Sequence, residues 1–213
     1  MIDNISVNDN NSIRIEDETA GVIYIDPYGI KGETHDASFV LVTHEHYDHY
    51  SPEDILKVAG DDTVLIVPEK MEGKTKGIAG KMKSVSTVKP GAFYEIEGLG
   101  FDTVPSYNIM KPFHTKGAGW VGYILHLSGK LIYIAGDTDA TNEAKAVKCD
   151  IALVPIGGTY TMDAKQAAEL INLIKPEYAI PVHYGSVAGS PAAGDRFAEL
   201  VNAPVSVVKK LSF

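Results

Sequence analysis

Short apolar runs recur along the chain and alternate with polar and glycine-containing segments. The runs are rich in valine, isoleucine, tyrosine and phenylalanine, which favour β-strands. Strands are predicted at residues 13–15, 22–25, 39–42, 64–67, 93–96, 121–127, 131–135, 151–154, 179–182 and 205–208. The early part of the chain passes mostly from strand to strand, whereas the late part alternates strands with helical patterns.

Helix signals lie between several of these strands. Ser51 and Pro52 offer an N-cap and a favourable first helical residue. A longer apolar face at helical spacing begins near Thr161 and stops before Pro176, and a shorter helix is predicted at 195–201. Strands and helices in this order indicate an α/β layered protein.

Composition and length narrow the class of protein. Of the 213 residues, 45% are hydrophobic and 22% are charged, which is typical of a globular chain and excludes disordered and fibrous classes. Because no linker-like stretch divides the chain, one domain is predicted over residues 1–213. The first 25 residues show no signal peptide, and no apolar run approaches the roughly 18 residues of a membrane span. We therefore expect no membrane partner.

The charge balance and the cysteine content change this picture slightly. With 28 acidic against 19 basic residues, the formal charge of −9 disfavours nucleic acid as a partner. The single cysteine, Cys149, excludes an internal disulfide and a multi-thiolate metal site, and it favours a reducing cytoplasmic location.

Candidate chemistry concentrates at residues 43–49, Thr-His-Glu-His-Tyr-Asp-His, directly after a predicted strand. Imidazole and carboxylate groups are ligands for divalent zinc, manganese or iron, and a turn after a strand can direct several of them to one point. Alternation would place His44 and His46 on one side, and the following turn could direct Asp48 and His49 toward a second ion. The alternative is a polar loop whose histidines face solvent.

This segment resembles the signature of the metallo-β-lactamase-fold hydrolases, and other segments agree in order. Residues 24–27 resemble the family's early strand ending in Asp-Pro, residues 134–139 the strand with the metal-bridging aspartate, and residues 181–185 the late strand with the last histidine. The matches extend from about Asp26 to His183, and the branch that looks most similar is that of small, stand-alone, ascorbate-phosphate lactonase-like proteins. The resemblance implies a four-layer αββα sandwich with the site along one edge of its two sheets.

The resemblance also implies a dinuclear metal site, with Zn²⁺ favoured and Mn²⁺ or Fe²⁺ as alternatives. Its ligands would be His44 and His46 for the first ion, Asp48, His49 and His183 for the second, and Asp137 as the bridge. Two ions sharing Asp137 would hold a bridging water and supply hydroxide at neutral pH, which would attack a carbonyl or phosphoryl centre.

Two positions depart from the family pattern. Asn108 stands where related small hydrolases carry a third histidine for the first ion, and His114 lies six residues further on. We favour His114, because imidazole is a far better donor than a neutral amide, and we assign Asp48 and His114 as the catalytic residues. Residues 8–11 replace a Gly-His pair of the opening strand, which leaves one wall of the pocket unassigned.

The expected function is hydrolysis of a small ester, lactone or phosphodiester, with an anionic substrate somewhat favoured. The alternatives are a metal-stabilised binding or regulatory protein without turnover, and a phosphodiesterase or nuclease-type activity on nucleotides. A homo-oligomer is compatible with the sequence.

Several other residues have both a structural and a functional interpretation. Asp26 could orient a metal-binding histidine or simply close a turn. The amides of residues 157–160 could bind an anionic group at a helix N-terminus, but a plain connection is favoured. Lys111 and Lys116 could attract an anion, although loop lysines usually face water. Tyr47 is expected to pack beneath the metal site rather than to touch substrate.

Overall fold

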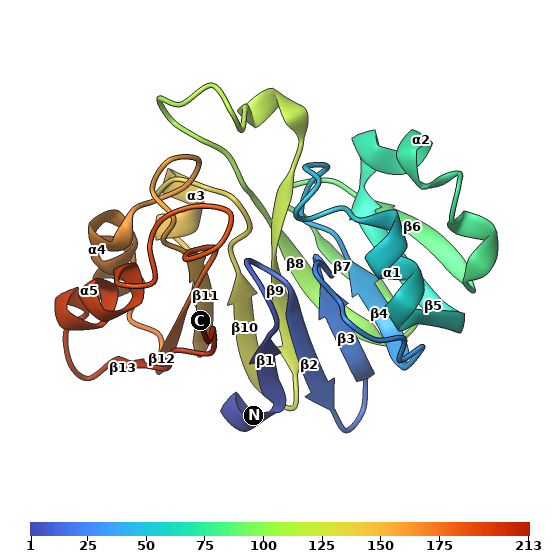
Figure 1. The fold of residues 1–213 in the computed structure, drawn as a ribbon, viewed down its shortest axis with the longest axis horizontal. Coiled ribbons are helices and arrows are strands. Elements are labelled where there is room, and N and C mark those ends of the chain that lie inside the picture. Colours follow the sequence, from blue (N-terminus) through green and yellow to red (C-terminus); the bar gives the residue numbers. More distant parts are fainter.

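Residues 1–213 are described by a computed structural model, in which two β-sheets lie face to face between outer helices (Figure 1). The strands are β1 Ile5–Val7, β2 Ile13–Asp17, β3 Gly21–Ile25, β4 Ala37–Leu41, β5 Ala59–Pro68, β6 Ser84–Val88, β7 Phe93–Ile96, β8 Leu99–Pro105, β9 Val121–Leu127, β10 Lys130–Ile134, β11 Ile151–Pro155, β12 Tyr178–Val182 and β13 Ser206–Val207. The α-helices are α1 Pro52–Val58, α2 Glu72–Thr75, α3 Asn142–Lys145, α4 Ala164–Ile174 and α5 Ala193–Leu200.

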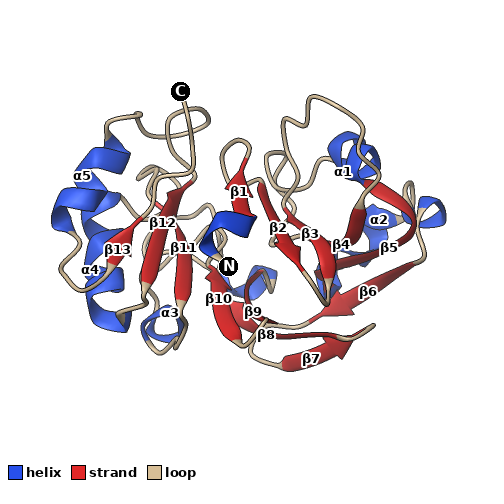
Figure 2. Ribbon diagram, turned by 90° about the horizontal axis from the view of Figure 1, so that it is seen from below, coloured by secondary structure: helices blue, strands red, loops and turns tan.

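Each sheet combines a parallel and an antiparallel part. The first has the order β1-β2-β3-β4-β5-β6, antiparallel from β1 to β3 and parallel from β3 to β6. The second has the order β13-β12-β11-β10-β9-β8-β7, parallel from β13 to β10 and antiparallel from β10 to β7. Helices α1 and α2 lie outside the first sheet, and α4 and α5 lie outside the second (Figure 2). The predicted four-layer αββα sandwich is therefore confirmed.

Strand β4 shows why its sequence is apolar at nearly every position. Its side chains alternate between two cores: Phe39 and Leu41 belong to the larger core between the sheets, whereas Val40 belongs to the smaller core beneath α1. A parallel strand covered on both faces needs apolar residues on both faces. The hydroxyl of Tyr123 on β9 donates to the backbone oxygen of Val42 at 2.7 Å, which ties the second sheet to the residue just before the 43–49 motif.

Helix starts follow local capping chemistry. Ser51 caps α1 as predicted, accepting a hydrogen bond from the Asp54 amide at 3.2 Å. The helix predicted to begin near Thr161 instead begins at Ala164, because Asp163 accepts from the Gln166 amide at 2.8 Å and donates its own amide to the Gln166 side chain. None of the helices has the length and apolar character needed to cross a membrane.

Other elements differ from the prediction. Strands β1, β6 and β8 and the four-residue helices α2 and α3 were not predicted, and the last predicted strand shortens to Ser206–Val207. Helix α5 begins at Ala193, two residues before the predicted start.

The carboxyl ends of parallel strands in both sheets reach one edge of the sandwich. Strands β3 and β4 end there in the first sheet, and β10 and β12 end there in the second, so the loops that follow them lie together. The long loop between β8 and β9 also extends along this edge, at the top of Figure 1. Parallel sheets commonly place ligand sites at such strand ends.

Candidate metal centre

The motif that follows β4 places its histidines close together. His44 and His49 are buried and His46 is half-buried. Nε2 of His44 lies 3.1 Å from Nδ1 of His46. The amides of His49 and Tyr50 donate to the His46 carbonyl, so a turn, and not an extended strand, carries the second half of the motif.

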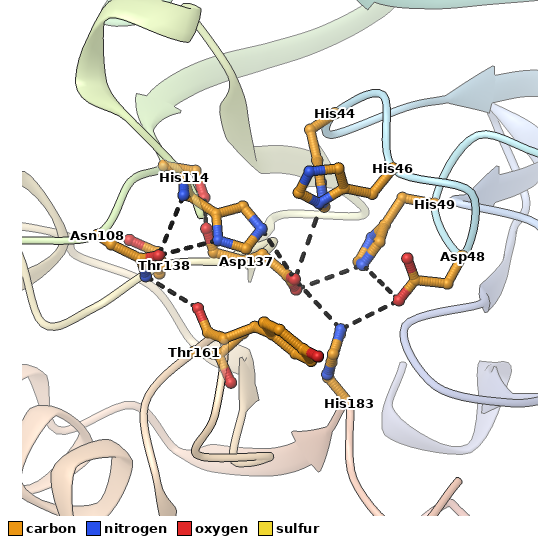
Figure 3. Close-up of polar contacts among 12 residues, drawn as sticks. His44, His46, Asp48, His49, Asn108, His114, Asp137, Thr138, Thr161 and His183 are labelled. Carbon is orange, nitrogen blue, oxygen red and sulfur yellow. Dashed lines mark hydrogen bonds and ion pairs between the residues drawn. The ribbon is translucent and has the colours of Figure 1, made fainter. Parts of the chain in front are cut away.

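Asp137, which follows β10, lies at the centre of the cluster (Figure 3). Its carboxylate approaches the Nε2 atoms of His114 and His183 at 3.2 Å each and that of His49 at 3.4 Å. Nε2 of His44 is 3.9 Å away. This single carboxylate therefore contacts side chains from both sheets.

Asp48 and His183 complete the other side of the cluster. Oδ2 of Asp48 lies 3.4 Å from Nε2 of both His49 and His183. His183 has a left-handed backbone (φ 55°), and a Cβ on Gly157 would lie 2.5 Å from the His183 carbonyl oxygen. A glycine at 157 is therefore required for His183 to occupy this position.

The loop between β8 and β9 brings His114, and not Asn108, to the cluster. Nδ1 of His114 lies 3.0 Å from Oδ1 of Asn108, while the side-chain nitrogen Nδ2 of Asn108 donates to the Tyr160 carbonyl at 2.9 Å. Because an amide oxygen only accepts, Nδ1 of His114 carries the proton and Nε2 keeps its lone pair. Asn108 thus lies behind His114 and fixes its tautomer.

Asp26 supports the motif from β3 and is completely buried. It accepts from Nδ1 of His49 at 2.7 Å and from the amide and hydroxyl of Thr43 at 2.7 and 2.6 Å. Its backbone is left-handed as well (φ 48°), so it closes the turn before the loop and also orients a histidine. Both interpretations of this residue hold together.

Two asparagines that the sequence did not assign also reach the cluster. Nδ2 of Asn10 donates to Asp48 and Nδ2 of Asn11 donates to Asp26, each at 2.8 Å. They come from the 8–11 segment whose role was unassigned. The run of asparagines was the only signal, and by itself it indicates only a turn.

Burial and neighbouring charges shift the acidities of these groups in opposite directions. Burial and the adjacent His49 lower the pKa of His44. Burial also opposes the charge of His183, but Asp137 and Asp48 outweigh it and raise its pKa to about 9. The pKa of Asp137 lies well below its usual value because His183 and His49 outweigh the effect of burial. Positive charge is therefore favoured at His183, beside the carboxylates, and disfavoured at His44.

The donor set fits a metal ion. Seven buried side-chain atoms have no hydrogen-bond partner, and four of them are the ligand atoms at the cluster: Nε2 of His49, His114 and His183, and Oδ1 of Asp137. Buried polar atoms are almost always paired, so this group is exceptional. The ligand atoms form three sets, and the atoms of each set lie within 4.8 Å of one another. The sets come from His44, His46 and His114, from His44, His49 and Asp137, and from Asp48, His49 and His183.

A cleft of about 320 Å³ opens beside the cluster. The cleft is lined on one side by the ligand residues His46, Asp48, His114, Asp137 and His183. Its walls are lined by Tyr47, Phe113, Tyr160 and Val187. Tyr47 was expected to pack beneath the site, and this expectation is wrong, because the turn at 46–49 breaks the alternation and turns its side chain outward.

Three remaining groups lie away from the cluster. His126 pairs with Asp102 at 2.8 Å on the exposed surface, and His35 contacts the Ala59 carbonyl in a surface loop. Glu45 pairs with Lys74 at 2.9 Å. None of these residues lines the cleft.

Trp120 packs against the first group of histidines. Its ring centroid lies 5.0 Å from that of His44, 4.9 Å from that of His46 and 5.5 Å from that of His114. The indole therefore covers the inner side of these three imidazoles and limits the orientations open to them.

Two sheets packed between helices, with buried histidines and aspartates at their shared edge, place the chain among metallo-β-lactamase-fold proteins. The chain belongs to the family described as the beta-lactamase superfamily domain, whose family model matches residues 4–183. The resemblance to the metallo-β-lactamase superfamily that was drawn from the sequence motifs is thereby confirmed.

Relatives of this chain carry consistent names. A UPF0173 metal-dependent hydrolase of Pyrococcus abyssi is 34% identical over 182 residues, which cover 81% of this chain and 78% of the relative. The crystal structure of a candidate metal-dependent hydrolase from Parabacteroides distasonis has a TM-score of 0.81 at 28% identity. The match covers 98% of this chain and 93% of the Parabacteroides chain. The metallo hydrolase Igni18 of Ignicoccus hospitalis shares the fold, with a TM-score of 0.74 at 22% identity over 98% and 95% of the two chains. These names specify metal dependence and hydrolysis, but no substrate.

The geometry around His114 predicts the effect of removing Asn108. In Asn108→Ala, His114 loses the acceptor for its Nδ1 proton, so we expect zinc affinity to fall by about 10- to 100-fold. His114→Ala should lower the zinc affinity further. Asn172→Ala, which removes an asparagine bonded to Leu200 far from the site, should leave the zinc affinity unchanged. Zinc titration calorimetry measures all three variants. A larger loss in Asn108→Ala than in His114→Ala would show that the amide is itself the ligand.

Proposed function

We propose that the protein is a dinuclear zinc hydrolase that cleaves a small ester, lactone or phosphodiester. The four buried ligand atoms without partners are the observation that carries this proposal. Imidazole nitrogens and carboxylate oxygens without any thiolate suit Zn²⁺, with Mn²⁺ or Fe²⁺ as alternatives. The family membership and the names of the relatives support metal dependence and hydrolysis.

The ligands divide into two sets around a shared carboxylate. Asp137 contacts histidines of both sets, which favours it as the bridge. The first ion would be held by His44, His46 and His114, and the second by Asp48, His49 and His183.

Bound divalent ions would supply a Lewis acid and a water of lowered pKa at this position. The protein's own groups prepare the site for that chemistry. Asp26 holds the Nδ1 proton of His49 and Asn108 holds that of His114, so both Nε2 atoms face the cluster. Asn10 holds Asp48 in place by donating a hydrogen bond to the Oδ2 atom of Asp48. Asp48 and His114 line the cleft, so a substrate can reach them, and we assign these two as the catalytic residues.

A protein nucleophile receives no support from the site. No serine or cysteine lines the cleft. The only thiol, Cys149, is packed against the large core, and burial raises its pKa to about 12, so it carries almost no thiolate at neutral pH. Its reduced state is compatible with the cytoplasmic location that we propose for the protein.

Metal analysis and a substrate panel test this proposal together. Protein purified without chelator should hold close to two ions per chain, measured by inductively coupled plasma mass spectrometry. It should hydrolyse at least one member of a panel of lactones, thioesters, esters and phosphodiesters, and Asp48→Ala should lower that rate by about 100-fold or more, because it removes a ligand that also lines the cleft.

Chelator-treated protein, with and without added zinc, is the control. One ion or none would contradict the dinuclear site. The absence of any rate that depends on Asp48 would favour the alternative of a binding or regulatory protein without turnover.

A further inference from the structure

We propose that the cleft binds an uncharged aromatic or apolar group as the non-reacting part of the substrate. This inference rests on the proposed function and narrows it. Substrates that carry a second charged group, such as nucleotides and sugar phosphates, are disfavoured.

The walls of the cleft are aromatic and accessible. The exposed fractions are 67% for Tyr47, 44% for Phe113 and 37% for Tyr160, which are large values for such side chains beside a buried cluster. Phe113 and Tyr160 meet edge to face with ring centroids 4.9 Å apart, so each holds the other in place. Val187 completes the apolar lining. A volume of about 320 Å³ lies within the usual range of small-molecule pockets.

Lys111 and Lys116, which flank the cleft residues Phe113 and His114 in sequence, do not line the cleft. No lysine or arginine lines the cleft. Lys111 is paired with Asp139 at 2.7 Å and also donates to the Thr161 carbonyl, while Lys116 is paired with Glu143 at 2.7 Å. Both lysines therefore have acidic partners and lie outside the cleft lining, which supports the structural interpretation of these residues.

Two amides of the loop at residues 157–160 are already bonded within the chain. The Gly158 amide donates to the Met162 carbonyl at 3.0 Å and the Thr159 amide to the Gly157 carbonyl at 3.2 Å. The N-terminus of α4 lies beside this loop, but Asp163 caps it and accepts a hydrogen bond from the Gln166 amide. An anionic group against the aromatic walls would lose hydration and gain no paired charge, which is unfavourable.

Matched ligands that differ in one charge test the inference by binding alone. Acetanilide is neutral, and 4-acetamidobenzenesulfonate adds an anion that ligates metals weakly. For the zinc-loaded protein, calorimetry should show acetanilide binding at least about tenfold more tightly. Phe113→Ala and Tyr160→Ala should each weaken acetanilide by roughly three- to tenfold, as expected for aromatic contacts.

Two further variants make the result specific. Phe93→Ala removes an exposed aromatic ring outside the cleft and should leave binding unchanged. Phe113→Lys places a cation in the wall and should shift the preference toward the sulfonate. Equal or tighter binding of the sulfonate by the unaltered protein, or no detectable binding of acetanilide, would overturn the inference.

Rates with the corresponding esters separate this inference from the proposed function. Phenyl acetate should be hydrolysed with a higher kcat/KM than 4-acetoxybenzenesulfonate. A metal-dependent preference for the sulfonate ester would overturn the inference and leave the hydrolase standing. Preferential binding of acetanilide without hydrolysis of either ester or of any member of the substrate panel would support the recognition of neutral groups and contradict the proposed function.

Discussion

Replacing Asp137 with alanine is expected to abolish hydrolysis and to deplete the protein of metal. The carboxylate lies within 3.2 to 3.4 Å of three histidine Nε2 atoms, and it is the only carboxylate that contacts histidines of both ligand sets. Its loss should remove several kcal/mol of transition-state stabilisation, and each 1.4 kcal/mol is a factor of ten in rate. We therefore expect kcat/KM to fall by about a thousandfold or more.

Metal content and kcat/KM should be measured on the same preparation of Asp137→Ala. Asp102→Ala is the matched control, because it removes a half-buried aspartate whose partner, His126, lies outside the cleft. Thermal unfolding verifies that each variant is folded. More than a tenth of the original activity in Asp137→Ala would show that this carboxylate is not shared between two ions.

Replacing Asp26 with alanine is expected to weaken both the fold and the metal site. Asp26 is completely buried and accepts four hydrogen bonds, from the amide and hydroxyl of Thr43, Nδ1 of His49 and Nδ2 of Asn11. Leaving these donors buried without an acceptor should lower the free energy of unfolding by about 3 to 5 kcal/mol. Because His49 also loses the group that orients it, zinc affinity should fall by about 10- to 100-fold.

Two variants separate these effects in urea unfolding and zinc titration. Asp26→Asn keeps a residue that tolerates the left-handed backbone. The loss of stability and of zinc affinity in this variant therefore measures the effect of the carboxylate alone. Asp17→Ala removes another buried, hydrogen-bonded aspartate at the opposite end of β2 and β3, and it should reduce stability without changing zinc affinity. Unchanged zinc binding in both Asp26 variants would contradict an orienting role.

The parts of the fold that were predictable have strong local signals. Strand β4 is apolar at almost every position because both of its faces are buried, and α4 has a continuous apolar face. By contrast, β8 contains Gly100 and ends in Pro105, which weaken a strand pattern, and four-residue helices such as α2 are too short to show helical spacing. The boundary of α4 depended on whether Thr161 or Asp163 forms the cap, which the side-chain contacts decide.

The site was predictable where its residues form a motif and not where they converge from a distance. The spacing of His44, His46 and His49 pointed to the cluster from the sequence. Asn10 and Asn11, however, act on aspartates 38 and 15 positions away, so no local pattern could reveal them. Tyr47 shows the opposite problem, because a strand-like alternation was assumed where the chain turns.

The position of Trp120 gives the protein an optical property of its own. It is the only tryptophan in the chain, and its indole packs against three of the histidines that would surround the first ion. Nearly all of the long-wavelength fluorescence of the molecule therefore originates beside that ion. Binding of an ion by His44, His46 and His114 should therefore change the emission of Trp120, which can be measured in real time and without a label.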